Sequence, residues 1–95
     1  MLDVAPLDPN EGDDVTATAS GGETGQTYML AAIELNGFPI FEVLVFDVMD
    51  EWGRYSITDA IPSGSSGITF TLQAYSIKYW KHRTVFSNAE QVTVQ

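Results

Sequence analysis

The 95-residue sequence contains no cysteine and only one histidine, His82. The absence of cysteine excludes a disulfide scaffold, a thiolate nucleophile and a cysteine-bound metal. The histidine lies in a stretch that we expect to form an exposed hairpin tip, where a general base would lack a partner and a shifted pKa. The sequence also lacks a nucleophile elbow, a phosphate-binding loop and paired metal-binding histidines. We therefore expect a protein that is not an enzyme, with no cofactor and no bound metal.

Basic residues are also scarce, with 4 Lys and Arg against 13 Asp and Glu and a net charge of −9. Such a chain repels phosphate, which argues against nucleic acid as a partner and disfavours anionic membrane surfaces. No apolar run is long enough to span a bilayer, and no signal peptide follows Met1. We expect no membrane insertion, and a single domain over residues 1–95 that belongs to a larger protein, with a small free-standing cytosolic protein as the alternative.

The sequence does contain short segments of alternating apolar and polar residues, separated by turn-forming residues. The most regular, residues 68–74, places Ile68, Phe70, Leu72 and Ala74 on one face. Further strands are expected over residues 2–7, 15–20, 27–34, 40–48, 54–61 and 84–95. About seven strands with regular turn signals and no long helix predict an all-β, immunoglobulin-like antiparallel β-sandwich, with a small barrel as the alternative.

Strand alternation also predicts how the loops are grouped. Successive connections fall at opposite ends, so loops 8–14, 35–39 and 62–67 share one end and loops 21–26, 49–53 and 81–83 share the other. The first end carries the acidic residues of loop 8–14. That loop has the oxygen density that calcium requires but not the alternating order of an EF-hand loop, so a calcium site and a solvated loop both stay open.

Several segments resemble a known family. Residues 12–21 (GDDVTATASG) resemble the second strand of bacterial immunoglobulin-like and fibronectin type III-like domains. Residues 61–74, from IPSG to TLQA, resemble the approach to the penultimate strand, and residues 87–94, from SNA to VTV, resemble the last strand. The resemblance implies an extracellular or cell-surface module of a larger protein. It implies no catalytic activity, because such sandwiches carry many unrelated functions.

The most distinctive segment for binding is residues 75–83, which hold three of the four basic residues. The strand parity of Tyr75, Ile77 and Tyr79 is opposite to that of Phe70, Leu72 and Ala74, which are expected to face the core. These three side chains are therefore expected to face outward. Tyrosine, tryptophan and arginine are the residue types that anchor interfaces. The predicted binding residues are Trp52, Tyr75, Tyr79, Trp80, Lys81 and Arg83. The alternative is that Trp80 covers the end of the core and the basic residues pair with Asp50 and Glu51.

These features predict a non-catalytic spacer or protein-interaction domain, whose partners are neighbouring domains of the parent chain or another protein. The alternative is a carbohydrate-binding module in which exposed aromatic rings stack on sugars. Aromatic side chains on one flat face favour the carbohydrate module, whereas burial of both tryptophans favours the spacer. Glu42 and Asp47 differ in strand parity, so we expect them on opposite faces and not as the carboxylate pair of a glycosidase.

Overall fold

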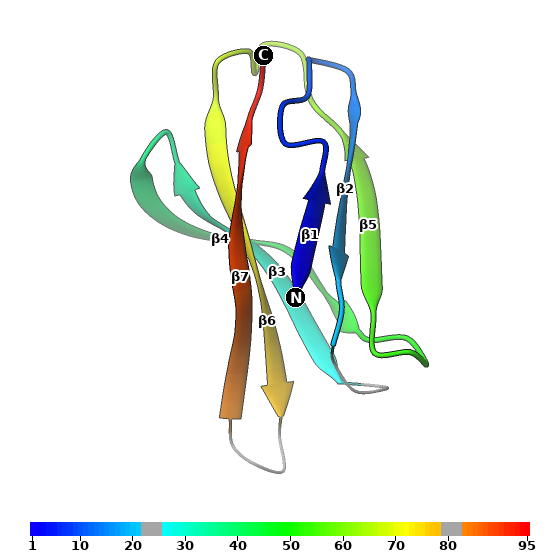
Figure 1. The fold of residues 1–95 in the computed structure, drawn as a ribbon. Coiled ribbons are helices and arrows are strands. Elements are labelled where there is room, and N and C mark those ends of the chain that lie inside the picture. Colours follow the sequence, from blue (N-terminus) through cyan, green and yellow to red (C-terminus); the bar gives the residue numbers. More distant parts are fainter. Residues whose placement is uncertain (22–25, 79–82) are drawn as a thin grey trace.

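The computed structural model describes residues 1–21, 26–78 and 83–95. Over these residues the chain forms two antiparallel sheets, which confirms the all-β sandwich prediction over the barrel (Figure 1). One sheet has the order β1-β2-β5 and the other β4-β3-β6-β7. The strands are β1 (Leu2–Ala5), β2 (Asp14–Ala19), β3 (Thr27–Leu35), β4 (Phe38–Val48), β5 (Tyr55–Ala60), β6 (Thr69–Lys78) and β7 (Arg83–Thr93).

The alternation in β2 has the predicted effect. Ala17 and Ala19 are buried against the other sheet, and Val15 packs partly against the same core. The hydroxyls point away from the core and pair with β5, with 2.8 Å between the Oγ1 atoms of Thr16 and Thr58. Period-two patterning therefore sets both faces of this sheet.

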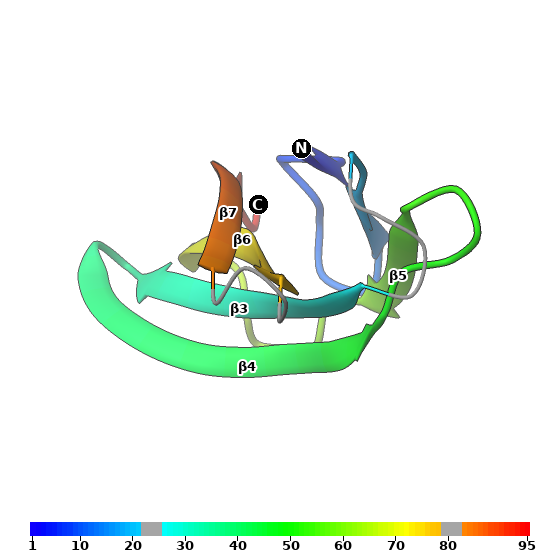
Figure 2. The ribbon, with the colours of Figure 1, turned by 90° about the horizontal axis from the view of Figure 1, so that it is seen from below.

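A two-residue turn joins β3 to β4 where the sequence predicts a longer break over residues 36–39. Asn36 and Gly37 both have positive φ, 51° and 82°, as a type I′ hairpin turn requires. Phe38 and Pro39 instead begin β4, which corrects the predicted boundary. Proline is tolerated there because β4 is an edge strand, where a missing backbone donor does not interrupt the sheet. The result is a long curved hairpin of β3 and β4 (Figure 2).

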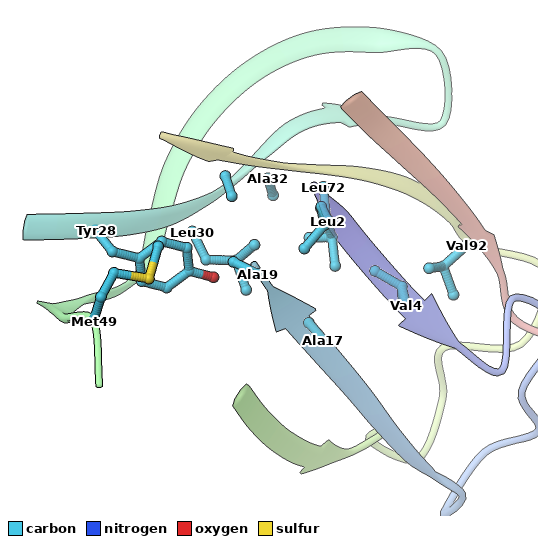
Figure 3. Close-up of a cluster of buried hydrophobic side chains, with 11 residues drawn as sticks. Leu2, Val4, Ala17, Ala19, Tyr28, Leu30, Ala32, Met49, Leu72 and Val92 are labelled. Carbon is cyan, nitrogen blue, oxygen red and sulfur yellow. The ribbon is translucent and has the colours of Figure 1, made fainter. Parts of the chain in front are cut away.

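The core lies between the two sheets and includes Leu2 and Val4 of β1, Tyr28 and Leu30 of β3 and Leu72 of β6 (Figure 3). The sequence also predicts that Leu30, Ile57, Phe70, Leu72 and Val92 are buried between the sheets. Leu30, Leu72 and Val92 are buried, which confirms that part of the prediction. Phe70 and Ile57, which were expected to be buried as well, are only partly buried and pack against the edge of the cluster.

The two sides of the sandwich differ. On the β1–β7 side, Asn88 bridges the sheets because its Oδ1 accepts from the Leu2 N–H and its Nδ2 donates to the Leu2 carbonyl, both at 2.9 Å. On the β4–β5 side, an open groove of about 340 Å³ reaches Leu30 and Leu72 in the core. The sandwich is therefore closed on one side and open on the other.

The grouping of the loops at two ends is confirmed for the described residues. At one end, the Ser66 N–H donates to Glu11 Oε1 at 3.0 Å and the Asn36 N–H donates to the Thr69 carbonyl at 2.7 Å. At the other end, the Met49 N–H donates to the Gln26 carbonyl at 2.9 Å. In the described part of the chain, no helix has the length and apolar character needed to cross a membrane.

Candidate binding surface

The outer face of the four-stranded sheet, turned away from the core, carries large apolar side chains on all four strands. Strand register identifies them, because cross-strand partners share a face. Met29 of β3 pairs with Phe46 and with Tyr75, and Tyr75 pairs with Phe86. Their parity is opposite to that of the buried Leu30 and Ala74. We define the outer face as Met29, Phe41, Val43, Phe46, Val48, Tyr75 and Phe86.

Three aromatic rings lie in contact along this face. The Phe41 and Tyr75 ring centroids are 5.8 Å apart with an interplanar angle of 63°, and those of Tyr75 and Phe86 are 6.4 Å apart at 50°. Ala31, which register places on the same face between Val43 and Gln73, is completely buried. Larger neighbouring side chains therefore cover the small residue, and the rings form a continuous surface.

Hydrogen bonds fix the central ring of this row. The Tyr75 hydroxyl donates to Gln73 Oε1 at 2.9 Å, and Gln73 Nε2 donates to the Ser87 carbonyl at 2.7 Å. Ser87 belongs to a bulge in β7, where the register with β6 shifts between the Gln73 and Tyr75 pairs. Tyr75 is thus held by two strands, and a partner that binds here does not have to order it.

The flanking apolar side chains remain open to solvent. Phe41, Phe46 and Phe86 are 60%, 62% and 68% exposed, and Val43 and Val48 are about half exposed. A contiguous apolar patch of this kind on a soluble domain marks an interaction surface, whereas scattered exposed residues are normal. The outer face is therefore the strongest candidate binding surface among the described residues.

The two acidic residues of β4, Glu42 and Asp47, lie on the side of the strand opposite to the outer face. The prediction that they face different sides is wrong. Glu42 pairs with the buried Ala32, and Asp47 pairs with the buried Tyr28, so both are on the side that faces the second sheet. The reason is a register shift at Leu44, where one extra residue in β4 reverses the parity of the strand. Both side chains are exposed at the edge of the sandwich.

Only part of the predicted binding segment can be placed. Tyr75 faces outward, as predicted, although it is half-buried between its aromatic neighbours. Trp52 lies in the β4–β5 turn, is 68% exposed, and has the Arg54 guanidinium 6.0 Å from its ring centroid. Tyr79, Trp80 and Lys81 lie outside the described residues, as does the side chain of Arg83. Whether these residues gather at one tip therefore stays a prediction.

Sequence reasoning missed Phe41, Phe46 and Phe86 as surface residues. The available signal was the unusual hydrophobicity of residues 37–50, which exceeds what a core of this size needs. Parity alone could not assign these side chains to a face, because the register shift at Leu44 separates Phe41 and Val43 from Phe46 and Val48.

Two carboxylates of the acidic loop 8–14 accept hydrogen bonds from backbone N–H groups. Asp13 Oδ2 accepts from the Asn10 N–H at 2.9 Å, and Glu11 reaches the β5–β6 loop. Within residues 1–21, 26–78 and 83–95, no three His, Cys, Asp or Glu side chains are grouped as a metal ion requires. Two of the four carboxylates of this loop, those of Glu11 and Asp13, therefore accept backbone N–H groups.

Comparison with known proteins adds no relative: no family model, no curated protein and no solved structure matches this chain.

Proposed function

We propose that this chain is a non-catalytic protein-interaction domain of a secreted or cell-surface protein, with an immunoglobulin-like or fibronectin type III-like fold, and that its binding surface is the outer face. The observation that carries the proposal is the contiguous, solvent-exposed apolar row on a sheet that already has a separate buried core. The resemblance of residues 12–21, 61–74 and 87–94 to bacterial extracellular domains supports the localisation. The order of the strands in the two sheets is compatible with that family.

The chemistry of the outer face favours protein over sugar. Interface centres are rich in aromatic and apolar side chains and poor in charge, and the face has this composition. A sugar platform needs rings that lie parallel to one surface, together with polar groups for the hydroxyls. The interplanar angles of 63° and 50° tilt the rings relative to each other.

A carbohydrate-binding module remains the second candidate, because aromatic side chains are exposed on the outer face and at Trp52. Affinity electrophoresis through gels that contain soluble xylan, β-glucan or mannan separates the two functions. Retardation of the wild type that is lost in the Trp52→Ser or Phe41→Ser variant would favour the carbohydrate module.

The proposal is tested with two matched variants of the 95-residue domain. Phe41→Ser with Phe86→Ser alters the outer face, whereas Trp52→Ser removes an equally exposed aromatic ring from a turn. The immobilised domain is used to capture secreted and surface proteins of its host, and the captured protein is purified and titrated. We expect the double variant to bind the captured protein about tenfold or more weakly than the wild type does. The Trp52→Ser variant should bind it with unchanged affinity.

Circular dichroism spectra of both variants must match the wild type, so that a lost fold is not mistaken for a lost contact. Full binding by a folded double variant would reject the outer face as the interaction surface.

A further inference from the structure

The edge of β4 is open along a long strand. β4 runs for 11 residues, and among the described residues it pairs only with β3. An edge strand presents unpaired backbone N–H and C=O groups that can accept another strand. Pro39 lies near the start of β4, so it removes a donor only there. The remaining residues can form a ladder with an added strand, except that the Val48 N–H already donates to Asp47 Oδ1.

The groove on the open side of the sandwich lies directly beside this edge. Leu44 and Val45 of β4 form one wall and Ile57 and Asp59 of β5 form the other, with Leu30 and Leu72 at the base. Its volume is about 340 Å³. A strand added to β4 directs alternate side chains toward the outer face and toward this groove. The edge therefore offers backbone pairing together with a site for side chains.

Acidic residues border the groove side of the edge. Glu42 and Asp47 lie on this side of β4, and Asp59 lines the opposite wall. β4 and β5 contain no lysine or arginine. Within the described residues none of these three carboxylates forms an ion pair; Asp47 and Asp59 accept only the N–H of the next residue. A partner with basic side chains on this side would compensate this charge.

The same carboxylates oppose pairing with a second copy of the chain. In an antiparallel β4–β4 pair, matching the outer faces along the strand places Phe41 opposite Val48 and Val43 opposite Phe46. This register also places Glu42 of each copy opposite Asp47 of the other. Like charges directly opposite each other destabilise a strand pair. This register is therefore unfavourable for pairing with a second copy of the chain.

We infer that the free edge of β4 binds an extended strand of another protein, in which apolar side chains face outward and basic side chains flank one apolar residue on the groove side. The inference rests on the proposed function and specifies its partner. The outward residues extend the outer face from Phe46 and Val43, the basic residues meet Glu42 and Asp47, and the central apolar residue enters the groove beside Leu44.

The test uses a capped peptide of the sequence Thr-Lys-Val-Leu-Val-Lys-Val-Thr, whose lysines and central leucine share one face. Binding to the ¹⁵N-labelled domain is followed by NMR at low salt. We expect shift changes over residues 40–48 and 55–60, and about tenfold tighter binding than that of the same peptide with glutamate in place of lysine. A peptide whose backbone nitrogens are methylated along the edge that faces β4 should not bind, because it lacks the N–H donors of the ladder.

Glu42→Gln with Asp47→Asn should reduce the preference for the lysine peptide to less than about threefold. The matched control, Asp3→Asn with Asp8→Asn, removes the same charge elsewhere and should keep the preference. The inference is overturned if the lysine and glutamate peptides bind alike, if the methylated peptide still binds, or if the shifts map outside β4 and β5. Dimerisation of the wild type through β4 would also overturn it, by identifying a second copy as the occupant.

These failures can be told apart from failure of the proposed function. If the peptide does not bind but the Phe41→Ser, Phe86→Ser variant loses a captured partner, then the outer face is an interaction surface and only the edge inference is wrong.

Discussion

Tyr28 is the residue with the most unusual environment in the core. It is completely buried, and its ring centroid lies 4.9 Å from that of Tyr55. Within the described part of the chain its hydroxyl has no hydrogen-bond partner. Burial, with a smaller contribution from Tyr55, raises the pKa of the Tyr28 hydroxyl from 10.0 to about 12, because the phenolate loses its hydration in the core. The folded protein therefore favours the neutral phenol.

The raised pKa predicts a loss of stability at alkaline pH. Below pH 10 Tyr28 is neutral in both the folded and the unfolded chain, so its contribution is fully present. Between pH 10 and about 12 it ionises in the unfolded chain first, so the free energy of unfolding falls through this range. Urea unfolding at pH 9, 10, 11 and 12 measures the fall, which should be smaller in Tyr28→Phe. An identical pH dependence in the variant would show that other groups cause the loss.

At the scale of strands, the bulge in β7 joins the two sheets. The shift in register turns Asn88 toward β1, where its amide bonds both backbone groups of Leu2. The Asn88 side chain thus bonds to Leu2 as the backbone of a neighbouring strand would, and it links two sheets that are not paired through their backbones. At the end of β7, the Thr93 N–H donates to the Leu7 carbonyl at 3.0 Å, so β7 is also bonded to the segment that follows β1.

Removal of this bridge should be costly. Asn88→Ala leaves the N–H and carbonyl of Leu2 without their partner, so we expect a loss of about 1–3 kcal/mol in the free energy of unfolding by urea. Asn88→Asp retains an acceptor for the Leu2 N–H but places a carboxylate oxygen against the Leu2 carbonyl and Glu90 Oε1, so it should also lower the free energy of unfolding. Asn10→Ala, in the exposed loop 8–14, should change the stability by less than about 0.5 kcal/mol. Equal effects at positions 88 and 10 would contradict the bridge.

At the scale of the whole molecule, the net charge of −9 acts on a sandwich with one open side. Acidic residues occupy both the loop 8–14 and the border of the groove. Like charges on a compact domain repel each other, and added salt screens that repulsion. We therefore expect this charge to oppose association through the apolar outer face and to lower the stability of the fold.

Screening should consequently hold or raise the melting temperature. We expect calorimetry between 0.01 and 0.5 M NaCl to show this response, at roughly the concentrations where the Debye length falls below 10 Å. Asp8→Lys, which reduces the net negative charge, should weaken the dependence on salt. A sharp fall in melting temperature would instead reveal stabilising ion pairs, with Arg54 or the basic residues 78–83 as the first candidates.

The sequence by itself determined the strands and the main turns, because alternation and turn residues act over a few positions. Ala17 and Ala19 face the core and Thr16 and Thr18 face away, as their spacing predicts. The outward direction of Tyr75 was also predictable, since β6 keeps its parity while the extra residue lies in β7.

Tertiary structure decided the candidate binding surface. A single extra residue at Leu44 places Glu42 and Asp47 on one side and aligns Phe41 and Val43 with Phe46 and Val48. The outer face also needs Tyr75 and Phe86, which come from strands far along the chain. Bulges and strand order depend on contacts between distant segments, and one inserted residue reverses every side chain beyond it. Local periodicity carries no information about either, so the same alternation that predicts a strand cannot predict which face becomes the surface.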